Sequence, residues 1–140
     1  MKLRVLLGHI DEAEAAGDLQ GGSSVFAVVR NESARLKSPE AWHAVSVIDV
    51  ELDVDAGAID LISDAAEDAK DITVAVLRAR VSRLPAESLE YEVFVRALAG
   101  DDDEPTANDA TPVVEAYGDE HGLGLMLWFD GYEDWIPSQN

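Results

Sequence analysis

The strongest pattern in the sequence is the stretch SVIDVELDVD, residues 46–55. Apolar and acidic residues alternate along it: Ile48, Val50, Leu52 and Val54 on one side, and Asp49, Glu51, Asp53 and Asp55 on the other. A period of two predicts a β-strand that packs one face on a core and turns the other to solvent. The solvent face is entirely acidic, so this stretch indicates both a β-rich fold and an acidic surface.

The hydrophobic period changes directly after this strand. Apolar residues then recur every three or four positions, at Ile59, Ile62, Ala65, Ala66 and Ala69. That spacing is typical of an amphipathic helix. We therefore expect the main helix over about residues 56–69, with Asp55 as its N-terminal cap.

Shorter apolar runs predict the other strands. They lie at residues 2–8, 25–29, 72–76, 89–96, 113–117 and 123–129. The turn-like residues 83–88 lead from one strand to the next, which predicts an antiparallel hairpin. The sequence does not fix the register of that hairpin, but one register would place Arg78 and Arg80 on the face of Glu90 and Glu92, where opposite charges attract across the strands.

Several connecting segments also carry readable signals. Ser38-Pro39 favours a short helical turn before Trp42. The composition of residues 101–111 is typical of a loop, and Asp130-Gly131 favours a two-residue hairpin turn. We find no repeat and no linker. We therefore predict one domain over residues 1–140, α+β and β-rich, with an antiparallel sheet or small barrel of about seven strands and one main helix.

The composition limits the classes of function. The chain has 29 Asp and Glu against 10 Lys and Arg, a net charge of −19, and 47% of its residues are hydrophobic. That apolar content predicts a folded chain rather than an acidic disordered one. Few basic residues are present to neutralise phosphates, so we expect no direct nucleic-acid binding. Because neither a membrane span nor a secretory signal is readable, we expect no membrane insertion and a cytoplasmic or virion location.

The acidity has three interpretations. Adaptation to a high-salt cytoplasm is one, since the composition is similar to that of proteins from halophilic archaea and their viruses, and only Lys2, Lys37 and Lys70 are lysines. A surface that docks a basic partner or mimics a polyanion is the second. An incidental low isoelectric point is the third.

The charges are unevenly distributed along the chain. Residues 97–140 contain 11 acidic residues and no Lys or Arg, whereas four arginines lie close together in sequence. These four are Arg78, Arg80, Arg83 and Arg96. The asymmetry predicts that copies of the chain could pair head to tail.

Motifs for chemistry are missing from the sequence. The chain has no cysteine, its three histidines lack the i, i+4 spacing of a helical metal site, and neither a phosphate-binding glycine motif nor a nucleophile elbow occurs. We therefore predict no catalytic residue, no metal site and no cofactor. Weak cation binding by the acidic row of residues 49–55 stays open.

Aromatic residues gather near the C-terminus. Trp128, Phe129, Tyr132 and Trp135 lie within eight residues of one another. They either lock a terminal hairpin onto the core or anchor an interface within an acidic rim. We take them, together with Arg78 and Arg80, as the candidate interface residues.

These observations favour a function without chemistry. We expect a non-catalytic, salt-adapted structural or assembly subunit that acts through protein–protein contacts in a multi-copy complex, such as a virion or tail component. Its partners would be copies of itself or other assembly subunits. The alternative is a small acidic inhibitor or immunity-type protein that binds a basic effector. A hydrolase with a carboxylate pair that the sequence does not identify is the third hypothesis.

Overall fold

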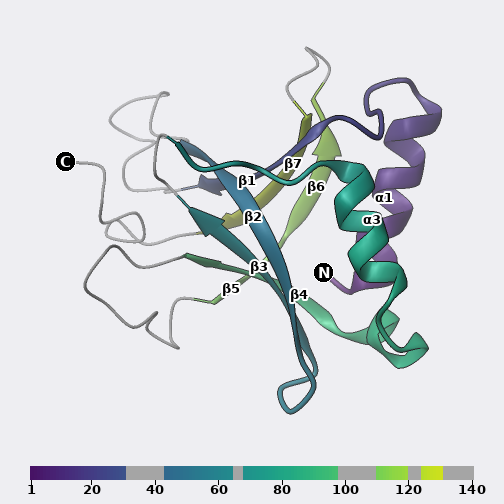
Figure 1. The fold of residues 1–140 in the computed structure, drawn as a ribbon, viewed down its shortest axis with the longest axis vertical. Coiled ribbons are helices and arrows are strands. Elements are labelled where there is room, and N and C mark those ends of the chain that lie inside the picture. Colours follow the sequence, from purple (N-terminus) through teal and green to yellow (C-terminus); the bar gives the residue numbers. More distant parts are fainter. Residues whose placement is uncertain (31–42, 65–67, 98–109, 120–123, 131–140) are drawn as a thin grey trace.

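One mixed β-sheet, with two α-helices on the same side of it, organises the part of the chain that the structure describes (Figure 1). This computed structural model describes residues 1–30, 43–64, 68–97, 110–119 and 124–130. No helix in these ranges is long and apolar enough to cross a membrane. The elements in chain order are α1 (Leu3–Ala15), β1 (Ser24–Arg30), β2 (His43–Asp53), β3 (Ala58–Asp64), α3 (Val74–Ser82), the 3₁₀-helix η2 (Ala86–Glu90), β4 (Glu92–Ala97), β5 (Thr111–Pro112), β6 (Glu115–Gly118) and β7 (Gly124–Asp130).

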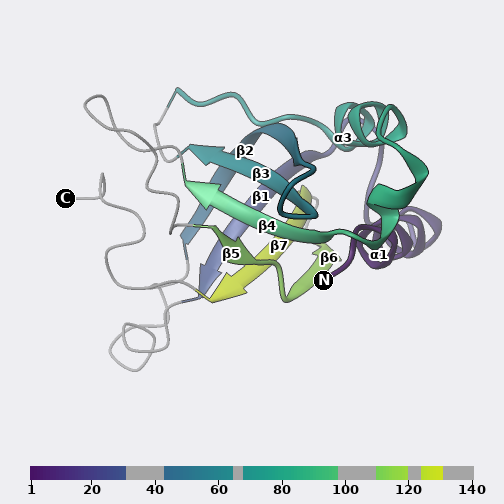
Figure 2. The ribbon, with the colours of Figure 1, turned by 90° about the horizontal axis from the view of Figure 1, so that it is seen from below.

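The seven strands lie in the order β5-β4-β3-β2-β1-β7-β6. The sheet curves into a half-barrel, and Figure 2 shows both helices at one end of it. Strands β3 and β4 are parallel because α3 connects them as a crossover, and β1 is parallel to β7. The β-rich prediction is therefore confirmed, whereas a purely antiparallel sheet is wrong for these two pairs.

The segment from β5 to β6 joins the two ends of the sheet. Thr111 and Pro112 pair with β4, and four residues later the same segment pairs with β7. Between them, the Val113 amide donates to the Val93 carbonyl at 3.0 Å and the Val114 amide donates to the Trp128 carbonyl at 2.8 Å. One short piece of chain thus bonds to both β4 and β7, which draws the ends of the sheet together.

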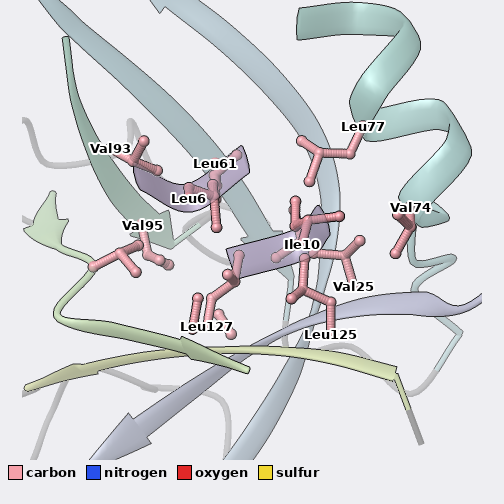
Figure 3. Packing of buried hydrophobic residues seen from close by; sticks show 14 of the residues in the cluster. Leu6, Ile10, Val25, Leu61, Val74, Leu77, Val93, Val95, Leu125 and Leu127 are labelled. Carbon is pink, nitrogen blue, oxygen red and sulfur yellow. The ribbon is translucent and has the colours of Figure 1, made fainter. Parts of the chain in front are cut away.

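The hydrophobic core lies between the sheet and the two helices. We call the face of the sheet that contributes to it the inner face, and Figure 3 shows its side chains pointing toward those of the helices. Burial of this aliphatic surface is the main stabilising term of the fold. The labelled residues are Leu6 and Ile10 of α1, Val74 and Leu77 of α3, and Val25, Leu61, Val93, Val95, Leu125 and Leu127 of the strands.

The helix predicted over residues 56–69 is wrong, because residues 58–64 form strand β3. This strand lies between β2 and β4, and residues 58–63 are buried on both of its faces. A strand buried on both faces loses its polar alternation, so Ile59 and Ile62 gave a misleading helical spacing. Asp53, rather than Asp55, caps the local turn by accepting from the Ala56 amide at 3.1 Å.

The strand predicted over residues 2–8 is also wrong, because helix α1 begins at Leu3. In this short window Leu3, Val5 and Leu7 fit a period of two. Farther along, the buried residues follow a helical period: Leu3, Leu6, Ile10 and Ala13. Val5 is exposed, as a helical period requires.

The predicted hairpin of residues 72–76 and 89–96 is also wrong, because most of its first half is helical rather than extended. Residues 74–82 form helix α3, whose buried residues are Val74, Leu77 and Val81. The Thr73 hydroxyl caps the helix by accepting from the Val76 amide at 3.2 Å. Because α3 separates β3 from β4, the predicted cross-strand pairing of Arg78 and Arg80 with Glu90 and Glu92 does not form.

The remaining strand predictions are confirmed, with shifted ends. Residues 25–29 lie in β1, residues 46–53 lie in β2, residues 92–96 lie in β4, and residues 124–129 lie in β7. Residues 113–117 become the end of the β5–β6 connection and most of β6. The predicted turn at Ser38-Pro39 and most of the loop at 101–111 lie outside the described residues, and so does Gly131 of the predicted hairpin turn, whereas Asp130 is the last residue of β7.

Candidate functional site

The face of the sheet opposite the helices, which we call the outer face, differs from the inner face in its chemistry. It is aromatic and apolar near β1, β7 and β6, and charged near β2, β3 and β4. Since side chains alternate along a strand, its residues are the sequence neighbours of core residues. Those used below are Phe26, Val28, Met126, Trp128, Tyr117 and Glu115 at the aromatic end, and Asp60, Arg96, Glu51 and Asp53 at the charged end.

Trp128 forms the base of the aromatic end. It is 9% exposed and packs in a second hydrophobic cluster with Val28 and Met126, against which Phe26 also packs. The Tyr117 ring lies 5.9 Å from the Trp128 ring between centroids, at an interplanar angle of 31°. Tyr117 itself is 38% exposed. The aromatic pair therefore has a buried member and a member that faces solvent.

Carboxylates flank this aromatic pair. In the pairing of β6 with β7, Glu115 lies directly opposite Trp128, and Tyr117 is two residues farther along β6. Partial burial raises the pKa of the Tyr117 hydroxyl; its interaction with Trp128 acts in the opposite direction, and the charges of Asp119 and Glu115 raise it further. The hydroxyl is therefore held in its protonated form, beside negative charge.

A buried ion pair lies at the charged end. Asp60 is 4% exposed, and its Oδ2 atom accepts a hydrogen bond from Arg96 Nη2 at 2.8 Å. Burial raises the pKa of Asp60, the nearby Arg96 guanidinium lowers it, and the Asp53 charge raises it again. Glu51 is the cross-strand neighbour of Asp60, so acidic groups lie side by side on β2 and β3 here.

The acidic row predicted on residues 46–55 is confirmed in part. Glu51 and Asp53 share the outer face of β2, Asp49 lies directly after a register shift between Val47 and Asp49, and Asp55 lies in the turn after the strand. Asp49 is paired with Arg80 of α3. Within the described ranges, no three Asp, Glu, His or Cys side chains are grouped so that they could hold a metal ion.

Arg78 and Arg80 both lie on α3 but contact different elements. Arg78 bridges to α1, with Nη2 2.5 Å from Asp11 Oδ1 and 2.8 Å from Glu14 Oε1. Arg80 reaches β2 through Asp49. These two candidate interface residues are therefore engaged in ion pairs within the chain.

The structure does not bring the described candidate interface residues into one site. Trp128 is on the outer face, whereas Phe129 points into the core and has no exposed surface. Tyr132 and Trp135 lie outside the described residues. Sequence reasoning missed Tyr117, although its alternation with Ala116 within a predicted strand places it on the same face as Glu115.

No protein-family model, no curated protein and no solved structure matches this chain.

Proposed function

We propose that the chain is a non-catalytic, salt-adapted subunit that acts through protein–protein contacts in a multi-copy complex, of the kind that builds a virion or a tail. The observation that carries this proposal is the exposed Tyr117 ring resting on the buried Trp128. Tyr and Trp are enriched among residues that dominate binding at protein interfaces. The partners are copies of the chain or other subunits, in the cytoplasm or the virion.

The charge of the chain sets the conditions for these contacts. At a net charge of −19, copies repel one another in dilute salt. The Debye length falls from about 10 Å at 0.1 M to about 3 Å at 1 M salt, so the repulsion is largely screened in molar salt. Contact between copies is therefore expected at high salt only.

Sedimentation analysis tests the assembly. We expect the molar mass to rise with protein concentration in about 2 M KCl and to stay monomeric in about 0.1 M KCl, following the screening of charge. A strict monomer at high salt and high concentration would contradict assembly from copies. Salt adaptation has its own test: the thermal unfolding midpoint should rise between about 0.1 and 3 M KCl, and a constant midpoint would overturn it.

One observation favours a second candidate function. Arg78, Arg80 and Arg96 are engaged in ion pairs within the chain, so they offer little positive charge to another copy. A small acidic inhibitor or immunity-type protein binds a basic effector one to one. In such a complex the excess acidic groups of this chain would pair with the basic groups of the effector. Capture of a basic nuclease or similar effector as a 1:1 complex, with no self-association at any salt concentration, would favour this candidate over assembly.

A further inference from the structure

We propose that the aromatic edge, which consists of Tyr117, Trp128 and Glu115, is a docking site for an arginine or lysine side chain of a basic partner protein. The inference rests on the proposed function, because it names the partner chemistry of the same surface. It commits to a basic segment of another protein as the occupant, rather than a second copy of this chain.

The ring geometry suits a cationic group. Tyr117 is 38% exposed and its ring lies 5.9 Å from that of Trp128, so the pair offers an aromatic surface to solvent on a rigid base. A cation over the face of a Tyr or Trp ring is attracted by the negative charge of the π-system. Trp128 is fixed by its packing with Val28 and Met126, which keeps this surface ordered before binding.

The charge around the ring suits the same group. Glu115 is exposed and lies opposite Trp128 in the strand pairing. It forms no ion pair with any residue in the described ranges; the Met1 ammonium, which lies 3.0 Å from the Val113 carbonyl oxygen, pairs with Glu92 instead. A guanidinium on the Tyr117 ring therefore meets a carboxylate as well as an aromatic face.

Most of the basic side chains that the structure describes are engaged away from the aromatic edge. In the described ranges Lys2 and Arg4 bind Glu90, and three arginines bind acids of other elements. Lys70 and Arg83 have no such partner within those ranges. Charge complementarity thus points to a partner richer in basic residues than this chain.

Peptide titration followed by NMR tests the site. The probes are a short arginine-rich peptide and the same peptide with citrulline, which keeps the shape and removes the charge. We expect the arginine peptide to shift the amide signals of residues 115–118 and the indole signal of Trp128. We expect the citrulline peptide to bind at least about tenfold more weakly, as loss of a charge-assisted contact implies.

Variants separate the aromatic contribution from general attraction to an acidic protein. Tyr117→Leu should weaken binding of the arginine peptide by about two- to fivefold, the range of an exposed cation–π contact, whereas Tyr117→Phe should leave this binding unchanged. Glu115→Gln should weaken it to a similar extent. Its matched control is Glu51→Gln, which removes one negative charge from the same outer face at the other end and should leave binding unchanged.

Four outcomes overturn the inference. They are equal binding of the citrulline peptide, signal shifts that map elsewhere, equal effects of Glu115→Gln and Glu51→Gln, and unchanged binding in Tyr117→Leu. Circular dichroism checks that each variant folds. If Tyr117→Leu does not fold, the comparison of Glu115→Gln with Glu51→Gln still tests the site. If Tyr117→Leu instead abolishes self-association at high salt, the occupant is a second copy and the basic-partner inference is wrong, although the proposed assembly function stands.

Discussion

The same strands form both faces of the sheet, but the two faces differ in their side-chain chemistry. On the inner face, strand β7 presents Leu125, Leu127 and Phe129 to a core that two helices cover. On the outer face, the residues that alternate with them on β7 are Met126 and Trp128. Trp128 contacts the exposed Tyr117, and the buried ion pair of Asp60 and Arg96 lies at the other end of this face. The inner face is uniform and accounts for stability, whereas the outer face is chemically varied and holds the groups suited to recognition.

Phe129→Ala gives the largest expected effect, because it removes a fully buried ring from the inner face. We expect a loss of about 3–5 kcal/mol in the free energy of unfolding, from lost transfer energy and the cavity that remains. Denaturant unfolding measures it. The comparison is Tyr117→Ala on the outer face, which should lose about 1 kcal/mol or less because the ring is partly exposed. Equal losses would contradict the division between the faces.

Arg96→Met tests the charged end of the outer face. The substitution leaves the buried Asp60 carboxylate without its cation, and we expect a loss of about 2–3 kcal/mol at pH 7, below the range for fully buried pairs because the Arg96 side chain is 26% exposed. The double variant Asp60→Asn/Arg96→Met removes both charges and should recover most of that loss. A double variant as unstable as the single one would show that Arg96 contributes packing rather than charge.

The pH dependence of stability should report Asp60 directly. Burial makes the folded-state pKa of Asp60 higher than its ordinary value of 3.8, despite the opposing Arg96 charge. The folded protein therefore holds this proton at pH values where the unfolded chain has lost it. The contribution of Asp60 to stability is thus fully present below about pH 3.8 and is lost as the pH rises through the folded-state pKa.

Asp60→Asn is the measurement for this titration. The difference in unfolding free energy, wild type minus variant, should be largest in acid and should decrease as the pH rises toward neutrality. A difference that instead increases with pH would mean that the Arg96 charge outweighs burial, and that the folded-state pKa of Asp60 is lowered.

The sequence predicted the fold best where one face of an element meets solvent. The acidic row on β2 is the example, since the exposed Glu51 alternates with the partly buried Val50 and Leu52. Strand β3 is the opposite case: six of its residues, 58–63, are buried on both faces, so local periodicity could not separate a central strand from a helix. Short windows also misled at α1 and α3, where the helical period of the buried residues emerges only over the whole length of each helix.

The pairing of strands that are far apart in the chain could not be predicted from the local sequence pattern. Strand β1 is parallel to β7, a hundred residues away, with Ser24 beside Gly124. A Cβ atom on Gly124 would lie 2.2 Å from the Ser24 carbonyl oxygen, and the φ angle there is +145°, so the close approach requires glycine. The register of β6 against β7 could not be predicted either. The contact between Tyr117 and Trp128 was therefore not foreseen, although each residue lay in a predicted strand.

Arg78→Met gives the smallest expected effect and tests how the inner side is held together. The Arg78 side chain joins α3 to Asp11 and Glu14 of α1 on the surface, above the aliphatic contacts that the two helices make with the core. Exposed ion pairs contribute little, so we expect a loss of about 0.5–1 kcal/mol in about 0.1 M salt.

The salt dependence distinguishes an electrostatic link from packing by the arginine stem. If the link is electrostatic, the difference between Arg78→Met and wild type should shrink toward zero in about 1 M KCl. Arg83→Met is the matched control, because it removes the same charge from the end of the same helix, where the side chain forms no ion pair with a described residue. A loss for Arg78→Met that persists in high salt would mean that its methylenes cover the helix interface, and that the inner side depends on apolar contact even at its surface.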